Sequence, residues 1–228
     1  MKYLLCVDTS SKNCSVAIVS FNEKEQQKNI VDFVDNLSEE YSHSEKLTFI
    51  VEEILLKNKL ELNMIKAVCL SSGPGSYTGL RIGSSVAKGI CYSLNIPLIS
   101  VSTLFSMSVG VFDKNKDYMY CPMIDARRME VYTALYDNNL STIKEPHSSI
   151  VDYNFLSSFL KDNKICFFGD GSKKIKEIIN NSNAIFLEDM YPSAKNMCDL
   201  AVLKYNNRDF EDTAYYEPFY LKDFYFGK

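Results

Sequence analysis

The residues whose types and spacing most clearly suggest ligand binding form a glycine-rich stretch over residues 73–83, Gly-Pro-Gly-Ser-Tyr-Thr-Gly-Leu-Arg-Ile-Gly. It follows an apolar run over 65–70 and opens into a helical pattern over 80–94. Such a turn between a strand and a helix is where α/β proteins bind anions, because free backbone N–H groups converge there. However, Leu80 and Arg81 stand where a Walker loop needs Lys and Ser or Thr, and the GxGxxG spacing is absent. The stretch therefore predicts neither kind of phosphate loop.

Two aspartates, Asp8 and Asp125, each close the first strand of a predicted hairpin. In ATPases of the actin type, two such turns hold phosphates across a cleft and a carboxylate binds magnesium or its water. The same side chains would cap their own turns in a protein that binds no nucleotide. No further acid or base is placed to serve hydrolysis, so we expect vestigial turns. The candidate residues are Asp8, Thr9, Ser10, Asp125, Arg127, Gly169, Asp170 and Gly171.

Histidine and cysteine form no recognisable catalytic or metal-binding pattern. The two histidines, His43 and His147, make no HxxxH or HExxH pair, and GxSxG is absent. The seven cysteines lack CxxC or Cys/His spacing and mostly lie in apolar runs, which indicates small buried side chains in a reducing compartment. We therefore predict no catalytic residue and no metal site. The sequence gives little support for peptidase chemistry.

The helix after the glycine turn carries small residues at every fourth position, Gly79, Gly83 and Ala87. Glycine within a helix costs up to about 1 kcal/mol relative to alanine, so a compensating close contact is expected. The neighbour is either the amphipathic helix of this chain around 47–55 or a helix of another protein. On the second alternative, a bulky residue at Gly83 should abolish partner binding while leaving the chain folded.

The hydrophobic pattern predicts a duplicated α/β chain. Expected strands lie over 3–7, 14–21, 31–37, 65–70, 96–101, 118–124, 130–136 and 165–168, and expected helices over 47–55, 80–94, 173–179 and 195–205. Ser42 and Glu45 have the spacing of a capping box before the first helix. Two halves that each open with a hairpin and a polar turn predict subdomains over 1–103 and 104–228, with a cleft between them.

The composition of the chain narrows the class of protein only a little. With 228 residues, a net charge of −4 and a pI of about 5.3, the chain does not have the composition of a free-standing nucleic-acid binder, since such proteins are basic on at least one face. No apolar run approaches the length of a membrane span, and Asp8 interrupts the N-terminal run too early for a signal peptide. We expect a cytoplasmic protein without membrane contact.

Together the motifs resemble the TsaB family, also called YeaZ, of bacterial tRNA threonylcarbamoyladenosine biosynthesis proteins. The resemblance rests on Val-Asp-Thr-Ser at 7–10, the stretch at 73–83, Asp-Ala-Arg at 125–127, Gly-Asp-Gly at 169–171 and Tyr-Pro-Ser-Ala at 191–194. The sequence departs from the family in lacking LLP after His43 and in having Lys222 where arginine is common.

The resemblance implies an α/β fold related to the actin-like ATPases, in two similar subdomains that each hold a mixed sheet and flanking helices. It implies a subunit without catalytic activity of its own. This subunit would serve N6-threonylcarbamoyladenosine formation at the adenosine 3′ of the anticodon in tRNAs that read codons beginning with A. Its partners would be the transferase TsaD, which carries the metal-binding histidines, and the small ATPase TsaE, with tRNA reached indirectly through the complex. The family has also been labelled an M22-type glycoprotease.

The resemblance also places a partner interface on the two helices of the first half, with homodimers when the partner is missing. It implies no cofactor and leaves open whether ATP or ADP binds at the interface. An independent ATPase, a glycoprotease and a tRNA-binding module remain the alternatives. The predicted interface residues are His43, Leu47, Ile50, Val51, Ile54, Gly79, Arg81, Gly83, Ala87 and Lys88.

Overall fold

The computed structural model describes residues 1–22, 27–38, 43–113 and 116–222, which divide into two compact units. The first holds Met1–Ser106 with Pro192–Phe219, and the second holds Met107–Tyr191 with the residues from Tyr220 onward. The expected division into 1–103 and 104–228 therefore needs correction, because the chain returns to the first unit near its end. The returning segment belongs there because Met197 and other apolar residues of it are buried against the first sheet.

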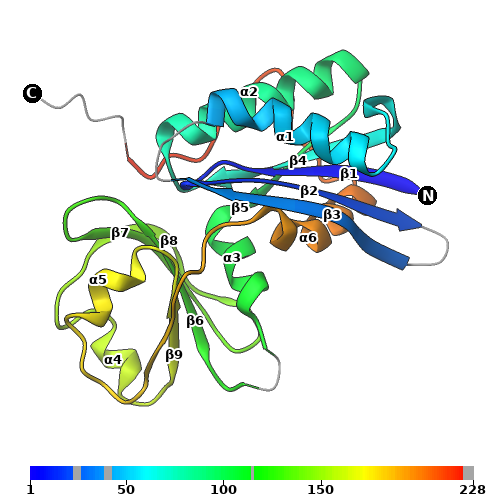
Figure 1. Ribbon diagram of the computed structural model, residues 1–228. Coiled ribbons are helices and arrows are strands. Elements are labelled where there is room, and N and C mark those ends of the chain that lie inside the picture. Colours follow the sequence, from blue (N-terminus) through cyan, green and yellow to red (C-terminus); the bar gives the residue numbers. More distant parts are fainter. Residues whose placement is uncertain (23–26, 39–42, 114–115, 223–228) are drawn as a thin grey trace, which may run out of the picture. The chain divides into compact units, whose positions relative to one another are not determined.

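The sheet of the first unit is built around its first strand (Figure 1). β1 (Lys2–Asp8) pairs antiparallel with β2 (Asn13–Asn22) and parallel with β4 (Ile65–Gly73). β3 (Gln27–Leu37) and β5 (Leu98–Ser102) form the edges. A central strand flanked on both sides must bury both of its faces, which explains the almost continuous apolar run at the N-terminus.

Helices cover both faces of this sheet. α1 (His43–Lys57) and α2 (Tyr77–Leu94) lie on one face, where they pack against Leu5 and Val7 of β1 (Figure 1). The 3-10 helix η2 (Ala194–Met197) and α6 (Cys198–Asn206) lie on the other, and η1 (Leu62–Met64) precedes β4. Alternate side chains of β1 therefore point to opposite faces of the sheet and belong to two separate cores.

The second unit repeats this plan. Its sheet has the order β10-β9-β6-β7-β8, in which β6 takes the place of β1 and the hairpin β6–β7 the place of β1–β2. The strands are β6 (Met119–Asp125), β7 (Glu130–Tyr136), β8 (Thr142–Ile150), β9 (Ile165–Phe168) and β10 (Ala184–Leu187). The helices are α4 (Ser157–Leu160) and α5 (Ser172–Lys176), and the division between the units falls within α3 (Thr103–Val111). The predicted duplication is confirmed.

Some elements differ from the sequence prediction. β8 was missed because it is an edge strand with Pro146 inside it, and its half-exposed residues hide the alternation. β10 and α4 were also missed, and α5 ends at Lys176 rather than at 179. The capping residue proposed for α1, Ser42, lies outside the described residues.

The cysteines behave as predicted: all of them are buried and none forms a disulfide. Burial raises the pKa of Cys14 and of Cys91 to about 11, so both remain neutral thiols. They serve as small core side chains. Among the described residues, no helix is both long and apolar enough to cross a membrane.

Candidate functional site

β1 ends in a polar turn in which Asp8, Thr9, Ser10 and Ser11 are buried. Asp8 Oδ1 accepts hydrogen bonds from the Ser10 backbone N–H at 2.9 Å and from Ser10 Oγ at 2.6 Å. The other carboxylate oxygen, Oδ2, is buried without a hydrogen bond from any described residue. Burial raises the pKa of Asp8 to about 6, against the hydrogen bonds from Ser10, which lower it. The turn thus holds a carboxyl group whose ionisation is costly.

The glycine-rich stretch packs directly on this turn. The Ser76 backbone N–H donates to the Ser10 carbonyl oxygen at 2.7 Å, and a Cβ atom at Gly75 would collide with the same oxygen. At the start of α2, the Gly79 N–H donates to Ser76 Oγ at 3.3 Å. Amide groups that could have bound an anion therefore form hydrogen bonds within the chain. The glycine-rich stretch thus closes the first candidate turn.

The small residues of α2 make room for this turn and not for a second helix. Thr9 Oγ1 donates to the Gly79 carbonyl oxygen at 2.7 Å. A Cβ atom at Gly79 would collide with the Thr9 carbonyl oxygen, and one at Gly83 with Thr9 Oγ1. Our prediction of a helix against this stripe was therefore wrong, and a bulky residue at Gly83 would disturb the fold.

In the second unit the corresponding turn is neutralised by a lysine. Asp125 Oδ1 accepts from the Arg127 backbone N–H and from Lys174 Nζ, each at 2.6 Å. Asp170 Oδ1 accepts from the Asp125 backbone N–H at 2.9 Å, and burial raises the pKa of Asp170. The structure thus brings these three predicted residues together, with an ammonium group beside the carboxylate that matches the magnesium-binding position of actin-type ATPases.

The two glycines after β9 are explained by packing. A Cβ atom at Gly169, whose φ is 98°, would collide with the Met123 carbonyl oxygen of β6. The Gly171 N–H donates to that same oxygen at 3.1 Å.

Within the described ranges, no three His, Cys, Asp or Glu side chains are grouped so that they could hold a metal ion. The cleft between the halves stays a prediction.

Most predicted interface residues lie in the core of their own unit. Leu47, Ile50, Val51, Ile54 and Ala87 are buried together with the sheet residues. His43 is buried as well, with Nε2 at 2.8 Å from the Ser11 carbonyl oxygen, and burial lowers its pKa. The buried side of α1 faces the sheet of its own unit, and a contact of these positions with a partner stays a prediction.

The two cations of α2 differ in their roles. Lys88 Nζ donates to the carbonyl oxygens of Ala214 and Tyr216, so it anchors the C-terminal segment of the first unit. Arg81 is exposed, and its guanidinium lies over the Tyr77 ring at 4.2 Å from the centroid. Arg81 is the more exposed of the two, and its contact with a partner stays a prediction.

Sequence reasoning missed the solvent side of the same two helices. Phe49 and Leu56 of α1 are 67% and 68% exposed, and Tyr92 of α2 is 88% exposed. A Cβ atom at Gly89 of α2 would meet nothing within 4 Å. We call this surface, formed by Phe49, Leu56, Gly89 and Tyr92, the helix face. Apolar residues outside the main amphipathic stripe were the signal that could have revealed it.

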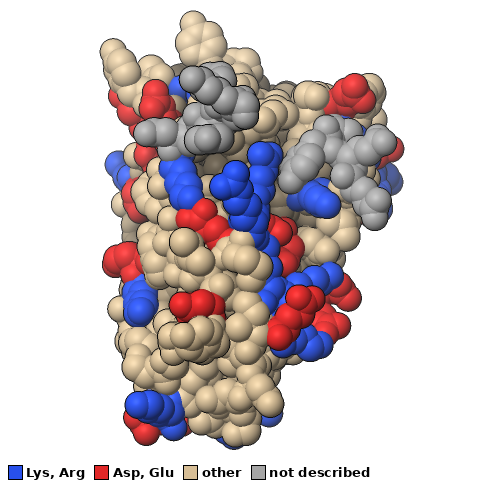
Figure 2. Space-filling model, turned by 90° about the vertical axis from the view of Figure 1, so that its left-hand side faces the viewer, with Lys and Arg blue, Asp and Glu red and all other residues tan. Residues whose placement is uncertain are grey.

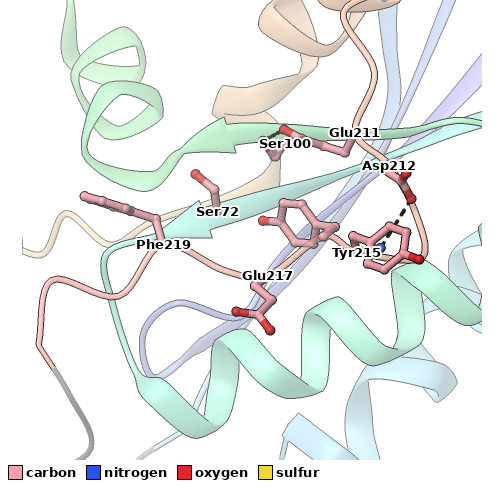
Figure 3. A pocket seen from close by; sticks show the side chains of 8 residues that line it. Ser72, Ser100, Glu211, Asp212, Tyr215, Glu217 and Phe219 are labelled. Carbon is pink, nitrogen blue, oxygen red and sulfur yellow. Dashed lines mark hydrogen bonds between the residues drawn. The ribbon is translucent and has the colours of Figure 1, made fainter.

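A shallow pocket of about 420 Å³ lies where the C-terminal segment crosses the ends of β4 and β5 (Figure 3). Two of its carboxylates are engaged: Glu211 accepts from Ser100 Oγ at 2.5 Å, and Asp212 accepts from backbone N–H groups of Ala214 and Tyr215. The Phe219 N–H donates to the Ser72 carbonyl oxygen at 2.7 Å. These contacts hold the segment in place and indicate a structural role. Within this segment Tyr216 is buried, whereas Tyr215 is exposed.

Comparison with known proteins identifies the family. A family model described as TsaD, tRNA N6-adenosine threonylcarbamoyltransferase, matches residues 39–225. The chain is 30% identical over 201 residues to the tRNA threonylcarbamoyladenosine biosynthesis protein TsaB of Buchnera aphidicola subsp. Schizaphis graminum, covering 85% of this chain and 90% of that protein. The chain belongs to the TsaB family.

Two further similarities agree. The TsaB protein of Haemophilus influenzae is 33% identical over 129 residues, which cover 57% of this chain and 51% of that protein, so this match spans about half its length. The structure of YeaZ from Pseudomonas aeruginosa is similar with a TM-score of 0.76 at 21% identity, covering 97% of this chain and 100% of that one. This likeness confirms the predicted actin-like fold class.

The buried Asp8 gives this TsaB-family chain a defined pH dependence. Because the folded-state pKa is about 6 and the ordinary value is 3.8, the folded state binds the proton more tightly. The stabilising effect is complete below pH 3.8 and is lost as the pH rises through 6. Asp8→Asn should therefore gain stability relative to wild type by about 2–3 kcal/mol between roughly pH 4 and pH 7.5. Urea unfolding across that range measures the difference.

Asp32→Asn is the matched control. Hydrogen bonds from Lys57 and Asn58 lower the pKa of Asp32, so the sign of its effect is opposite: the wild type loses the stabilising contribution as the pH falls. Parallel pH curves for wild type and Asp8→Asn would contradict a raised pKa for Asp8.

The glycines of α2 should divide into two classes. Gly79→Ala is expected to lower the free energy of unfolding by about 1–3 kcal/mol, since its Cβ atom meets the Thr9 backbone. Gly89→Ala is expected to raise it by up to about 1 kcal/mol, because the space is open and alanine favours helix. Thermal or urea unfolding of both variants tests this, and equal effects would rule out the packing of Thr9 as the reason for Gly79.

Proposed function

We propose that this chain is a non-catalytic subunit required for N6-threonylcarbamoyladenosine formation at the adenosine 3′ of the anticodon in tRNAs that read codons beginning with A. It would act in the cytoplasm by dimerising with a TsaD-like transferase, together with a TsaE-like ATPase. The names of its TsaB relatives support the pathway. The match to a family model named for the transferase supports a pair of related subunits, since related surfaces can substitute for one another.

The closed first turn and the neutralised second turn support a role without chemistry of its own. The N–H groups of Ser76 and Gly79 are bonded within the chain, and Lys174 neutralises Asp125. A nucleotide site of the actin type needs both turns open toward phosphate and a carboxylate available to magnesium. The geometry therefore favours a supporting subunit over an independent ATPase.

The helix face is the single observation that carries the proposed pairing. α1 and α2 lie on the same face of their sheet (Figure 1), and their inward sides are filled by the core. Phe49, Leu56 and Tyr92 remain exposed, beside an open Gly89 at which a partner helix could approach closely. Exposed acidic residues at positions 52 and 53 border the apolar side chains on α1, so a partner with a basic rim would fit. Without the transferase, a second copy could occupy the same face as a homodimer.

Reconstitution tests the function. Unmodified tRNA would be incubated with the TsaD-like transferase, the TsaE-like ATPase and the adenylate-forming enzyme of the same organism, with and without this chain. We expect modified adenosine, measured by mass spectrometry of nucleosides, only when the chain is present. Equal yields without it would contradict the proposal, and micromolar ATP affinity of the chain alone in calorimetry would favour the ATPase.

A charge in the helix face should separate binding from folding. Leu56→Glu is expected to weaken the complex with the transferase at least tenfold, because the carboxylate would be buried against an apolar partner surface. Leu203→Glu on α6 is the matched control, since Leu203 is 57% exposed on the opposite side of the sheet. Both variants should unfold within about 0.5 kcal/mol of wild type. Equal affinity of both variants for the transferase would remove the helix face as the interface.

A further inference from the structure

The turn between β6 and β7 holds two consecutive arginines in an unfavourable backbone conformation. Arg127 has a φ of 71° and Arg128 a φ of 48°, which is the left-handed region. This region costs an L-residue about 1–2 kcal/mol, and hairpin turns that need it twice usually contain Asn-Gly or Gly-Gly. Two arginines at these positions therefore carry a cost in stability that their side chains must offset elsewhere.

Backbone hydrogen bonds fix the turn. The Arg127 N–H donates to Asp125 Oδ1 at 2.6 Å, and the Glu130 N–H donates to the Arg127 carbonyl oxygen at 3.1 Å. The Ala126 N–H donates to the Glu130 carbonyl oxygen at 3.1 Å. Arg127, Arg128 and Met129 are all exposed, and we call these three residues the arginine tip. The tip is thus a defined surface and needs no rearrangement to present its guanidinium groups.

The charge of the tip is not neutralised by the described residues around it. The nearby carboxylates are already engaged, Asp125 by Lys174 and Glu130 by Lys222. Neither tip guanidinium forms an ion pair with any residue in the described part of the chain. Basic and acidic side chains are interspersed on the face that Figure 2 shows, so pairing and not the net charge decides where a cation is available. The tip therefore supplies two positive charges on an acidic chain.

Exposed apolar side chains adjoin the tip. Ile150, at the end of β8, pairs with Glu130 in the strand register, and the Val151 N–H donates to the Met129 carbonyl oxygen at 2.8 Å. Met129 and Ile150 are exposed, and so is Tyr153, two residues after Val151 in the chain. Guanidinium groups beside flat or apolar side chains suit RNA, in which phosphates alternate with bases that can stack. An acidic protein surface would use the charges but would gain less from these neighbours.

We infer that the arginine tip contacts the phosphate backbone of tRNA directly, with the exposed side chains of Met129, Ile150 and Tyr153 beside the adjoining nucleotides. This inference rests on the proposed function for the identity of the RNA. It goes beyond the expectation that the chain reaches tRNA only through its partner. The contact is local, so it is compatible with the net charge of −4.

The test removes both guanidinium groups without straining the turn. In R127G/R128G, glycine adopts the left-handed backbone freely, so the free energy of unfolding should be retained or increased. The matched control is Arg208→Gly, since Arg208 is also exposed and has a φ of 55°. R127K/R128K keeps the charge. Binding of unmodified tRNA to the full-length chain with its transferase partner would be followed by fluorescence anisotropy over a salt series.

We expect R127G/R128G to bind tRNA about tenfold more weakly at low salt, with a slope of log K against log salt that is smaller by about 1–2. R127K/R128K and Arg208→Gly should keep the wild-type slope. An unchanged affinity and slope for R127G/R128G would overturn the inference. So would a loss of affinity for the transferase or the ATPase with tRNA binding intact, because the tip would then contact an acidic protein surface.

The two proposals fail in different ways. If omission of the whole chain leaves the yield of modified adenosine unchanged in the reconstituted reaction, the proposed function is wrong, whatever the tip binds. If the chain is required for modification while R127G/R128G keeps the wild-type tRNA affinity and salt slope, only the inference about the tip is wrong.

Discussion

The packing of Thr9 and Ser10 against the start of α2 is the contact on which the first unit depends. Thr9 Oγ1 donates to the Gly79 carbonyl oxygen, and the Ser10 carbonyl oxygen accepts from Ser76. This approach is close enough that a side chain at any of three glycines of the stretch, those at 75, 79 and 83, would collide with the turn. The position of α2 on the sheet is therefore set by the turn, and α1, which shares its core, lies beside it.

The same contact occupies an amide group that a glycine-rich stretch at a helix start could otherwise offer to a phosphate. In a phosphate loop, glycines let the backbone approach an external anion. In this chain the approaching groups belong to the β1–β2 turn: the Ser10 carbonyl oxygen accepts from the Ser76 N–H, and Thr9 Oγ1 donates to the Gly79 carbonyl oxygen. Asp8 is buried as a consequence, because the turn that carries it is covered by α2. The glycine-rich stretch thus resembles an anion site in sequence and local geometry, but the β1–β2 turn of the same chain takes the place of the anion.

Sequence patterns predicted the elements of the first unit well, because its strands and helices have clean periods. The bounds of β7 and β9 were also predicted to the residue, since both are short apolar runs bounded by turn residues. β8 was not predicted, because an edge strand with Pro146 keeps little alternation. The burial of the predicted interface residues could not be read from the sequence for a different reason: the period of α1 shows that Leu47 and Ile54 share a face, but not whether a sheet of the same chain or another protein covers it. The small residues of α2 posed the same ambiguity.

The duplicated halves differ most in the helix that comes after the parallel neighbour of the central strand. In the first unit, β4 leads into α2, which has 18 residues and covers the β1–β2 turn. In the second, β9 leads into α5, which has 5 residues and supplies Lys174 to Asp125. A turn covered by a long helix becomes part of the core, so its residues are chosen by packing. A turn left uncovered keeps its side chains in solvent, where an arginine pair at positive φ contributes nothing to the core. Folding alone does not explain the presence of the arginine pair there, and contact with a polyanion would explain it.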